Sequence, residues 1–498
     1  MKILSARQIK ELDAYTIQHE PIASIDLMER ACSAFVNWFT DHVESTRKIG
    51  IVCGTGNNGG DGLGIARMLN DWGYPVKVWI VRGLVPESGD FKINLSRLIG
   101  KLDCSDIVTE PEKEIFDDRE VLIDAVFGTG LSRTPEGIYA HVIESMNRAT
   151  AVRIAVDIPS GLSANDHSAG SILKADYTIS FQLPKLAFLL PQNHQYVGQW
   201  TTVDIGLQKE FIQNTKSVYF YITQKDARKT LKPRSAFDHK GKYGHALLIS
   251  GSYGKMGAAI LASRAALRSG LGLLTVHVPK TGYTILQTAV PEAMTSTDEH
   301  DFVFTGITSV EKFGAMGVGP GVGTSKETVK GFSTLMDSFR KPMVIDADGL
   351  NILSANRELL HLIPENSILT PHPGEFERLV GSWRNDFERL KKQQALAIQL
   401  KSVIVLKGAN TSIATPEGVV YFNSTGNPGM ATGGSGDVLT GMLMSFLAQS
   451  YSSVQASILG VYLHGLSGDF AAREKGMDAL IASDIVDFLP EAFRKIIR

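Results

Sequence analysis

The sequence predicts an α/β protein of two domains, each built around a largely parallel sheet. Short apolar runs that fit buried strands alternate with amphipathic helical patterns in both halves of the 498 residues. Glycine-rich loops follow many of these runs, as in open α/β sheets, which bind ligands at the carboxyl ends of their strands. A polar stretch from Asp204 to Arg234 separates the halves. The predicted domains are therefore residues 1–216 and 217–498.

The composition argues against several classes of protein. The net charge is −2 and 20% of residues are charged, with no long run of one sign, so neither nucleic acid nor a membrane surface is an expected partner. The cysteines, Cys32, Cys53 and Cys104, show no Cys-x-x-Cys spacing, which disfavours disulfides and zinc. The N-terminus lacks the apolar core of a signal peptide, and no apolar run approaches the roughly 20 residues that span a bilayer. We expect a soluble, cytoplasmic protein.

The first half predicts a Rossmann-like domain. Its expected elements are two helices within Ser5–Phe39, the strand Lys48–Cys53, the loop Gly54–Gly62, the helix Leu63–Trp72 and the strand Val76–Val81. Gly54, Gly56 and Gly59 match the dinucleotide fingerprint G-x-G-x-x-G between a strand and a helix. The acidic residue that binds ribose in NAD dehydrogenases is missing, because Arg82 follows the second strand. An ordinary dehydrogenase is therefore disfavoured.

Polar residues follow three strands of this half. Asn58 and Asp61 are unusually polar for a pyrophosphate turn, Asp124 lies within the strand Val121–Phe127, and Asp157 and Ser160 end another strand. Any one of these residues is more often structural than functional. Because the carboxyl ends of parallel strands share one edge of the sheet, we expect four of them to converge on a ligand crevice: Asn58, Asp124, Asp157 and Ser160.

Three motifs of the first half together resemble the NAD(P)H-hydrate epimerase family. They are Gly54-Thr-Gly-Asn-Asn-Gly-Gly-Asp-Gly62, Asp124 with Gly128-Thr-Gly-Leu-Ser-Arg133, and Asp157-Ile-Pro-Ser-Gly161. The resemblance covers about the first 215 residues. It implies a domain that interconverts the R and S epimers at C6 of hydrated NADH and NADPH (NADHX and NADPHX).

The same resemblance implies the roles of individual residues. Asn58, Asp124 and Ser160 would hold a potassium ion through oxygen atoms, and we expect Asp124 to move the proton. The implied substrate contacts are Asn57, Asn58, Gly59, Gly60, Asp61, Gly128, Thr129, Gly130, Leu131, Ser132, Arg133, Thr134 and Asp157.

The second half predicts another largely parallel sheet, covered by helices on both faces. Its expected strands are Ala246–Ser250, Leu273–Val278, Ala315–Val318, Pro342–Asp348 and Val403–Lys407. The loop Gly251–Gly257 has too few residues before its lysine for a Walker A motif.

The stretch Gly426–Gly441 predicts a phosphate site. It is rich in glycine and runs into an apolar helical pattern, so free backbone N–H groups and the positive end of a helix dipole would face a ligand. Asp437 stands where a carboxylate could accept the proton of an attacking hydroxyl. An ordinary helix-capping Asp is the alternative. Lys407, at the end of a strand, fits either a phosphate contact or a surface lysine.

His372 and Glu375 do not have the spacing of a zinc pair, and no third ligand is evident. We expect them to position substrate instead.

Residues from about Arg234 to the C-terminus resemble the ADP- or ATP-dependent NAD(P)H-hydrate dehydratases, which have a ribokinase-like fold. Gly434-Ser-Gly-Asp437 is similar to the anion-hole and base motif of that superfamily, although Ser435 stands where alanine is usual. Asn427-Pro-Gly-Met-Ala-Thr-Gly-Gly433 separates dehydratases from sugar and vitamin kinases. Asp437 would be the base, and fused proteins of bacterial type typically use ADP.

Two sets of binding residues follow from this second resemblance. The implied hydrate-binding residues are Gly321, His372, Pro373, Gly374, Glu375, Phe376, Glu377, Arg378 and Asp437. The implied ADP-binding residues are Lys407, Gly408, Ala409, Asn410, Thr411, Asn427, Gly429, Thr432, Gly433, Gly434, Ser435 and Gly436.

The combined hypothesis is a repair enzyme that epimerises hydrated NAD(P)H and dehydrates the S form. Its expected cofactors are potassium and ADP with magnesium, and a homo-oligomer is expected. One alternative is a small-molecule kinase of the same fold that phosphorylates a vitamin precursor and is fused to a nucleotide-binding module. Another is a first domain that only binds nucleotides or a partner. A stable phosphorylated product would identify the kinase.

Overall fold

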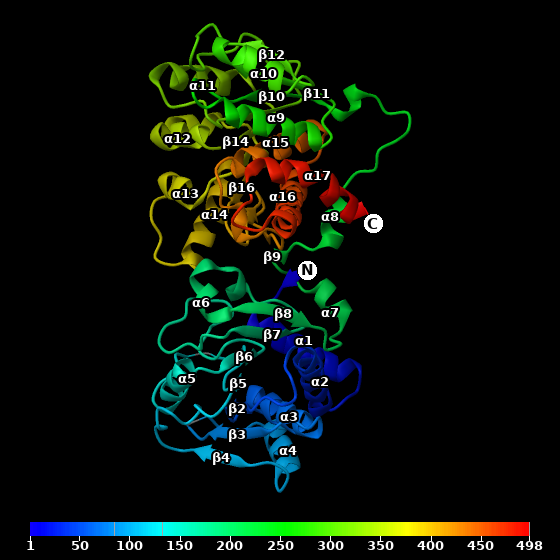
Figure 1. Ribbon diagram of the computed structural model, residues 1–498, viewed down its shortest axis with the longest axis vertical. Helices are drawn as coiled ribbons and strands as arrows, with labels where there is room; N and C mark the ends of the chain where they lie inside the picture. Colours follow the sequence, from blue (N-terminus) through cyan, green and yellow to red (C-terminus); the bar gives the residue numbers. More distant parts are fainter. Residues whose placement is uncertain (84, 132, 498) are drawn as a thin grey trace. The chain divides into compact units, whose positions relative to one another are not determined.

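The computed structural model describes residues 1–83, 85–131 and 133–497. Two compact units divide them: an N-terminal unit of residues 2–217 with 385–387, and a C-terminal unit of residue 1 with 218–384 and 388 onward. Each unit contains a sheet flanked by helices, so the predicted α/β class is confirmed (Figure 1). Within the described ranges, no helix is long and apolar enough to cross a membrane.

The N-terminal unit contains a parallel sheet in the order β4-β3-β2-β5-β6-β7-β8. The strand order reverses between β2 and β5, and such a reversal opens the crevice where α/β sheets bind ligands. The short strand β1 (Lys2–Ile3) precedes the unit's first helix. The strands of the sheet are β2 (Ile49–Cys53), β3 (Val76–Val81), β4 (Cys104–Ile107), β5 (Val121–Ala125), β6 (Val152–Val156), β7 (Tyr177–Phe181) and β8 (Gln199–Val203).

Helices of the N-terminal unit bury apolar residues against both faces of this sheet. On one face Phe35, Phe39 and Leu63 are fully buried, and on the other Val142 and Met146. The helices are α1 (Ala6–His19), α2 (Ser24–His42), α3 (Asn57–Asp71), α4 (Gly89–Leu98), α5 (Ile138–Arg148), α6 (His194–Val197) and α7 (Lys209–Asn214).

Helix α3 begins at Asn57, whereas the sequence pattern placed the start at Leu63. The expected loop Gly54–Gly62 is therefore wrong from Asn57 onward. Asn and Gly are poor helix formers, so the local pattern indicated a loop. Close packing of this turn against its neighbours outweighs that preference.

The C-terminal unit contains strands in the order β9-β18-β17-β16-β15-β14-β13-β10-β11-β12. Neighbours are parallel except that β17 is antiparallel to both β16 and β18. The order reverses between β10 and β13, which marks a second ligand crevice. The strands are β9 (Tyr219–Tyr221), β10 (His245–Ile249), β11 (Leu273–Val278), β12 (Met294–Thr297), β13 (Ala315–Val318), β14 (Met343–Ile345), β15 (Ile368–Leu369), β16 (Val403–Leu406), β17 (Ser412–Ala414) and β18 (Val420–Phe422).

Helix α15 lies at the centre of the C-terminal unit's core. Residues 438–448 are all buried, and a Cβ at Gly441 would overlap the carbonyl oxygen of Ala262 on α9, so these helices pack closely. The helices are α8 (Gln224–Thr230), α9 (Met256–Arg268), α10 (Tyr283–Ala289), α11 (Lys326–Ser338), α12 (Asp348–Ala355), α13 (Pro373–Val380), α14 (Asp386–Leu400), α15 (Ser435–Ala448), α16 (Ser453–Lys475) and α17 (Ala482–Ile497).

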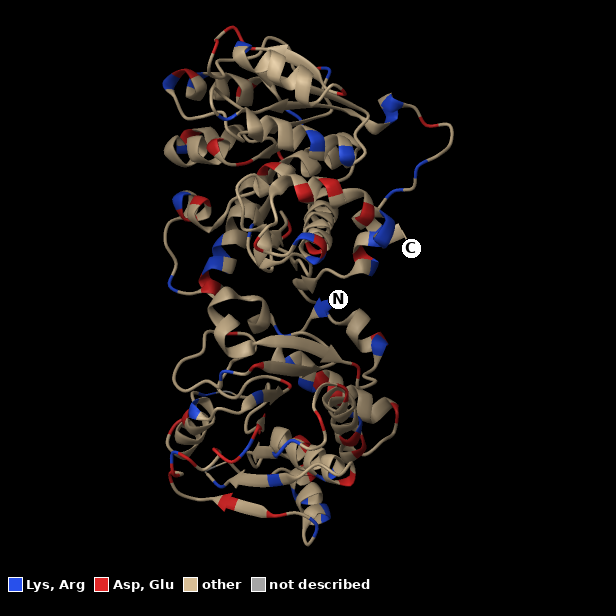
Figure 2. Cartoon of the chain, viewed as in Figure 1, with Lys and Arg blue, Asp and Glu red and all other residues tan. Residues whose placement is uncertain are grey.

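Charged residues of both signs are interspersed within each unit (Figure 2). This distribution agrees with the net charge of −2.

Candidate active sites

The turn between β2 and α3 is folded tightly against its neighbours. A Cβ at Gly59 would overlap the carbonyl oxygen of Gly54, and a Cβ at Gly54 would overlap the carbonyl oxygen of Val126, just beyond β5. Both positions therefore require glycine. The turn brings the N-terminus of α3 to the place where the strand order reverses, which is the expected ligand crevice.

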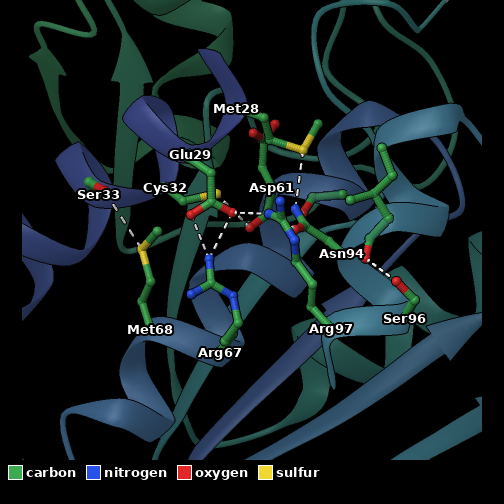
Figure 3. Close-up of polar contacts among 12 residues, drawn as sticks. Met28, Glu29, Cys32, Ser33, Asp61, Arg67, Met68, Asn94, Ser96 and Arg97 are labelled. Carbon is green, nitrogen blue, oxygen red and sulfur yellow. Dashed lines mark hydrogen bonds and ion pairs between the residues drawn. The ribbon is translucent and has the colours of Figure 1, made fainter. Parts of the chain in front are cut away.

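Two side chains fix the backbone of the first turn of α3 (Figure 3). The Asn94 amide nitrogen on α4 donates to the Gly60 carbonyl at 2.9 Å. The Cys32 thiol on α2 donates to the Asp61 carbonyl at 3.3 Å. The predicted substrate-binding residues Asn57–Asp61 thus belong to the start of α3, which side chains from α2 and α4 hold in place.

Glu29 on α2 links the same three helices through an ion-pair network (Figure 3). Its carboxylate accepts from Arg67 on α3 at 2.5 Å and from Arg97 on α4 at 2.6 Å. These side chains are partly exposed, so each pair adds little stability alone, but together they fix the relative position of the helices. The sequence pattern did not reveal this support.

Asn58, Asp124 and Ser160 meet at the carboxyl edge of the sheet. Asp124 is fully buried, and its oxygens accept hydrogen bonds from the Ser160 hydroxyl at 2.6 Å, the Ser160 N–H at 2.8 Å and the Val126 N–H at 3.2 Å. Burial raises the pKa of Asp124 to about 6. A Cβ at Gly128 would lie 3.2 Å from the Asn58 amide oxygen, so Asn58 reaches the loop that follows β5.

This cluster fits a hard cation. The Ser160 hydroxyl lies 3.3 Å from the carbonyl oxygen of Phe127, so carboxylate, hydroxyl and carbonyl oxygens gather within one site. Such oxygen sets suit hard cations rather than zinc or copper. The Asn58 amide nitrogen is buried without a hydrogen-bond partner in the described chain, which indicates that its environment is completed by a ligand. The prediction that Asp124 also moves a proton stays a prediction, and its three hydrogen bonds weigh against it.

Asp157 forms a buried ion pair that the sequence pattern did not reveal. Lys185, only 1% exposed, donates from Nζ to Asp157 Oδ1 at 2.7 Å. The ammonium also donates to the Ser180 hydroxyl and to the carbonyl oxygens of Phe181 and Leu183. A lysine inside the apolar run 183–190 was the available signal.

Two further carboxylates lie close to Asp157. Burial, followed by the charges of Asp157, Asp13 and Asp90, raises the pKa of Asp61 well above its ordinary value. Burial and the Asp157 charge raise the pKa of Asp13 to about 6, against the opposing charge of Lys185. Asp13, on α1, is a residue that the sequence analysis missed.

The predicted substrate loop after β5 is partly exposed. The N–H of Leu131 donates to the carbonyl of Gly128 at 3.2 Å, which closes a turn over residues 128–131. Arg133 and Thr134 are exposed. Ser132, also predicted to contact substrate, lies outside the described residues.

In the C-terminal unit, the loops after β10 and β13 meet at the second reversal of strand order. The Ser252 hydroxyl donates to the Gly321 carbonyl at 2.7 Å, and the Ser250 hydroxyl donates to the Pro320 carbonyl at 2.7 Å. Gly321 has φ = 67°, a conformation that favours glycine. The predicted hydrate contact at Gly321 therefore lies at the expected crevice.

Asp346 is the centre of the polar network in this unit. It is 1% exposed and accepts from Lys407 Nζ at 2.8 Å, from the Thr440 hydroxyl at 2.7 Å and from the Ala347 N–H at 2.8 Å. Lys407 also lies 3.9 Å from Glu375. The ends of β14 and β16 and the helices α13 and α15 are thereby connected. Asp346 appeared in the sequence analysis as part of a strand, without a role.

Asp437 stands in the first turn of α15, next to this network. Gly434 caps the helix in a left-handed conformation, with φ = 92°. A Cβ at Gly436 would lie 3.4 Å from Lys407 Nζ, so the ammonium lies beside the free N–H groups of the helix start. Burial and Asp346 raise the pKa of Asp437 to about 6, against the charge of Lys407. An ammonium group and a helix N-terminus next to a carboxyl group suit phosphoryl transfer.

Helix α16 supports the glycine-rich loop through two residues that the sequence analysis missed. His464 Nε2 lies 3.0 Å from the Ser435 carbonyl oxygen, and burial lowers the pKa of His464 to about 4, so the neutral ring donates this hydrogen bond. Asp469 accepts from the Gly426 N–H and from the Asn427 amide nitrogen, each at 3.0 Å. The loop is therefore held at both ends.

His372 is the N-cap of α13. Its Nδ1 accepts from the Gly374 N–H at 3.1 Å, and Glu375 accepts from the His372 N–H at 2.9 Å, which forms a capping box. Phe376 is fully buried and packs against Trp383, so its side chain supports the helix rather than a ligand. Among the remaining predicted residues of this helix, Pro373, Glu377 and Arg378 are exposed.

The predicted ADP-binding residues after β16 form a short polar turn. The Thr411 hydroxyl donates to the Gly408 carbonyl at 2.9 Å, and Gly408 and Ala409 are exposed. Gly429 donates its N–H to the Asn427 side chain at 3.0 Å. Asn410, Thr432 and Gly433 are at least partly exposed and thus open to a ligand.

Two family models match the chain. One is described as NAD(P)H-hydrate dehydratase and matches residues 246–491. The other is described as the YjeF-related protein N-terminus and matches residues 24–187.

Similar proteins are known from bacteria and archaea. A bifunctional NAD(P)H-hydrate repair enzyme of Moorella thermoacetica is 36% identical, with 100% of this chain and 97% of that protein aligned. A protein of the same name from Thermofilum pendens is 34% identical over 100% of this chain and 97% of its own length. The crystal structure of a ribokinase-like superfamily protein from Enterococcus faecalis is 27% identical, with a TM-score of 0.51, and covers 57% of this chain and 98% of its own.

Proposed function

The chain belongs to the family of bifunctional NAD(P)H-hydrate repair enzymes, and from that premise we propose how its two units divide the repair. The enzyme restores hydrated NADH and NADPH by epimerising the C6 hydrates and dehydrating the S form with ADP. The N-terminal unit carries the epimerase site. The C-terminal unit, most of which matches the dehydratase model, carries the dehydratase site.

In the dehydratase site, Asp437 accepts the proton of the C6 hydroxyl. The hydroxyl oxygen then attacks the terminal phosphorus of ADP, and the bond between that phosphorus and the bridging oxygen of AMP breaks. Next the C6–O bond breaks, a proton leaves C5, and the C5–C6 double bond forms as inorganic phosphate departs. The products are NAD(P)H, AMP and phosphate. The observation that carries this proposal is that the Lys407 ammonium lies beside the start of α15, where its positive charge acts on the carboxyl group of Asp437.

The phosphates of ADP occupy the positive pocket formed by Lys407 and the N–H groups of residues 433–436. Developing negative charge is stabilised there because the donors are already oriented by Asp346 and His464. ADP brings magnesium with it, as nucleotides usually do. Residues 408–411 and 427–429 contact the rest of the nucleotide. Gly321, His372 and Glu375 position the hydrate.

In the epimerase site, Asn57–Asp61, residues 128–134 and Asp157 contact the hydrate. Asn58, Asp124 and Ser160 hold potassium. When bound, the ion supplies a fixed positive charge at the carboxyl edge of the sheet. Asp124 remains the sequence-based candidate for proton transfer.

We place the enzyme in the cytoplasm and expect a homo-oligomer. Both expectations come from the sequence. Light scattering of the purified full chain measures the oligomeric state, and fractionation of the source cell measures the compartment.

The decisive test is recovery of dihydronicotinamide absorbance from mixed R and S hydrated NADH, supplied with ADP, ATP or neither. Full ADP-dependent recovery, faster than spontaneous epimerisation allows, is expected. Rapid recovery that stops at the S fraction would leave a dehydratase without epimerase activity. A stable phosphorylated product in place of NADH would favour a kinase, and no recovery with either nucleotide would overturn the proposal.

A further inference from the structure

Lys185 is a buried cation that the proposed function does not yet use. Its side chain is 1% exposed, and a lone buried ammonium is strongly unfavourable unless it is paired. Apart from Asp157, the groups that accept hydrogen bonds from its ammonium belong to the end of β7 and the start of the loop that follows it. This arrangement attaches the Asp157 carboxylate to the edge of the sheet.

The contacts of Asp157 are concentrated on one oxygen. Oδ1 accepts from Lys185 Nζ at 2.7 Å, from the Phe181 N–H at 3.0 Å and from the Ser180 hydroxyl at 3.3 Å. Within residues 1–83, 85–131 and 133–497, Oδ2 accepts no hydrogen bond. One carboxylate oxygen is thus anchored while the other is available to a substrate.

The backbone of Asp157 is strained. Its φ is 66°, a left-handed value that a non-glycine residue adopts at a free-energy cost. Hydrogen bonds on both sides hold it there, since the Asp157 N–H donates to Ile179 and the Ile158 N–H donates to Val156, each at 2.8 Å. Such strain concentrates at sites where a side chain must point in one direction.

Asp61 is a second carboxyl group of this unit, and its surroundings differ from those of Asp157. Its carbonyl is fixed by Cys32, but its carboxyl group makes no hydrogen bond within the described part of the chain. After burial, the negative charges that act on its carboxyl group are those of Asp157 from the loop after β6, Asp13 from α1 and Asp90 from α4. Burial and these three negative charges favour the neutral acid, so Asp61 can donate a proton near neutral pH.

We propose that Asp157 is the base and Asp61 the acid of the epimerisation reaction, and that Lys185 positions Asp157. The proposal rests on the proposed epimerase function and names the groups that move its protons. A carboxylate that is anchored through one oxygen, as in Asp157, and a carboxyl group whose burial favours the protonated form, as in Asp61, suit the roles of base and acid. In this proposal Asp124 holds the cation together with Ser160, to which it is hydrogen-bonded, and transfers no proton.

The reaction balances without any further reagent. C6 of the hydrate carries a hydroxyl group and the ring nitrogen N1. Asp157 takes the hydroxyl proton, the C6–O bond becomes a carbonyl, the C6–N1 bond breaks, and N1 takes the proton of Asp61. Rotation about C5–C6 presents the other face of the aldehyde to N1. Attack of N1 then forms the opposite epimer, while Asp61 regains its proton from N1 and Asp157 returns its proton to the oxygen.

The test uses the full chain with Asp61→Asn or Asp157→Asn and measures exchange between R and S hydrated NADH by chromatography. Each variant should lose about 10²–10⁴-fold in kcat for epimerisation, the usual contribution of a general acid or base, with KM changed less than threefold. ADP-dependent dehydration of pure S hydrate, which occurs in the other unit, should stay unchanged and serves as an internal control. Asp90→Asn is the matched control and should retain the rate below neutral pH.

The pH profile distinguishes chemistry from structure. Wild type should give a bell-shaped kcat/KM curve, because the base must be ionised and the acid protonated. The residual kcat/KM of Asp157→Asn should no longer fall at acidic pH. The residual kcat/KM of Asp61→Asn should no longer fall at alkaline pH. Asp90→Asn should shift the alkaline limb to lower pH, since it removes a negative charge that holds the proton on Asp61. Lys185→Met removes the donor that holds Asp157 Oδ1 at 2.7 Å and should lower kcat for epimerisation more than it changes KM, as expected for a positioning residue.

The outcomes separate this proposal from the proposed function. A wild-type protein that shows no epimerisation contradicts the function itself. An active wild type whose Asp61→Asn and Asp157→Asn variants both keep their rates within threefold overturns the acid–base pair. If Asp157→Asn unfolds the N-terminal unit, Asp61→Asn alone decides, because the Asp61 carboxyl makes no hydrogen bond that folding could need.

Discussion

Asp437 is surrounded by charges of both signs. Burial and the carboxylates of Asp346 and Asp348 favour its protonated form, whereas Lys407 favours the ionised form, and the resulting pKa is about 6. If Asp437 is the base, dehydration should rise tenfold per pH unit below about 6 and become constant above it. The measurement is kcat/KM for S hydrate with saturating ADP from pH 4.5 to 8. A rate independent of pH across this range would contradict the role.

Replacing Asp437 by Asn should remove the base while keeping the shape of the helix start. We expect dehydration to fall by about 10²–10⁴-fold, the usual contribution of a general base. Epimerisation should be unchanged because its residues lie in the other unit. Both rates can be measured on one preparation. Turnover near the wild-type value would exclude Asp437 as the base.

The same substitution should stabilise the C-terminal unit at neutral pH. In the folded chain Asp437 has a pKa of about 6, raised from 3.8, so the unfolded chain releases this proton at lower pH than the folded one. The wild type therefore loses stability as pH rises from about 4 through about 6, and the Asn variant does not. Thermal unfolding should show a higher midpoint for Asp437→Asn at pH 8 and no difference at pH 3.5. The reverse order would contradict the raised pKa.

At the residue scale, sequence reasoning identified groups whose signal is local. Asp437 and Lys407 were found because one follows a glycine-rich stretch and the other ends an apolar strand. Asp346 was not assigned a role, because its partners Lys407 and Thr440 lie 61 and 94 positions away. Lys185 was missed for the same reason, since only the fold shows that it is buried.

The start of helix α3 depends on a glycine that admits no side chain. Gly59→Ala would place a Cβ against the Gly54 carbonyl oxygen, which is backbone and cannot rotate away. We expect epimerisation to fall more than about tenfold and the N-terminal unit to lose about 1–3 kcal/mol, the range for overpacking. Gly89→Ala, at the start of α4 with nothing within 4 Å of the new Cβ, is the matched control. Equal effects of the two substitutions would show that packing at Gly59 is unimportant.

Helix α15 packs on the sheet through apolar side chains, and the buried hydroxyl of Thr440 adds a hydrogen bond to the end of β14. Thr440 donates to Asp346 at 2.7 Å, and Thr440→Val would leave a buried carboxylate oxygen without this donor. A hydrogen bond to a charged group contributes about 1.5–3 kcal/mol, so the urea midpoint of the C-terminal unit should decrease accordingly. Dehydration should also slow, because Asp346 holds Lys407. Thr440→Ser keeps the hydroxyl group and should behave like wild type; a loss equal to that of valine would contradict the hydrogen-bond explanation.

The central strands of both sheets were predictable from periodicity, whereas several shorter or outer strands and the start of α3 were not. The helix start at Asn57 was placed too late, since its Asn-Asn-Gly-Gly sequence indicates a turn when tertiary packing is unknown. Strands β17 and β18, which introduce antiparallel pairing, are only three residues each. So short a run carries too little alternation to identify a strand.

For the whole molecule, each unit has its own hydrophobic core. We expect two unfolding transitions in calorimetry. ADP with magnesium should stabilise the transition of the C-terminal unit by about 2.7 kcal/mol at one hundred times its Kd and leave the other transition unchanged. Lys407→Ala should abolish most of this shift. A shift of both transitions together would show that the units unfold as one.

Family, fold class and enzymatic activity were predictable from the sequence, and the comparisons confirm them. The glycine-rich motifs are enough to identify the family because each motif is a continuous stretch of sequence. The ligand contacts proposed for individual residues remain predictions that the experiments above address.

The proposed placement of the two sites on separate units of a single chain has a consequence for metabolic control. Every translated molecule carries one epimerase site and one dehydratase site, so their stoichiometry stays at unity whatever the level of gene expression. The steady-state concentration of the R hydrate then depends on the two turnover numbers and on ADP supply rather than on the relative abundance of two gene products. A cell can therefore change its total repair capacity without altering the balance between the two steps.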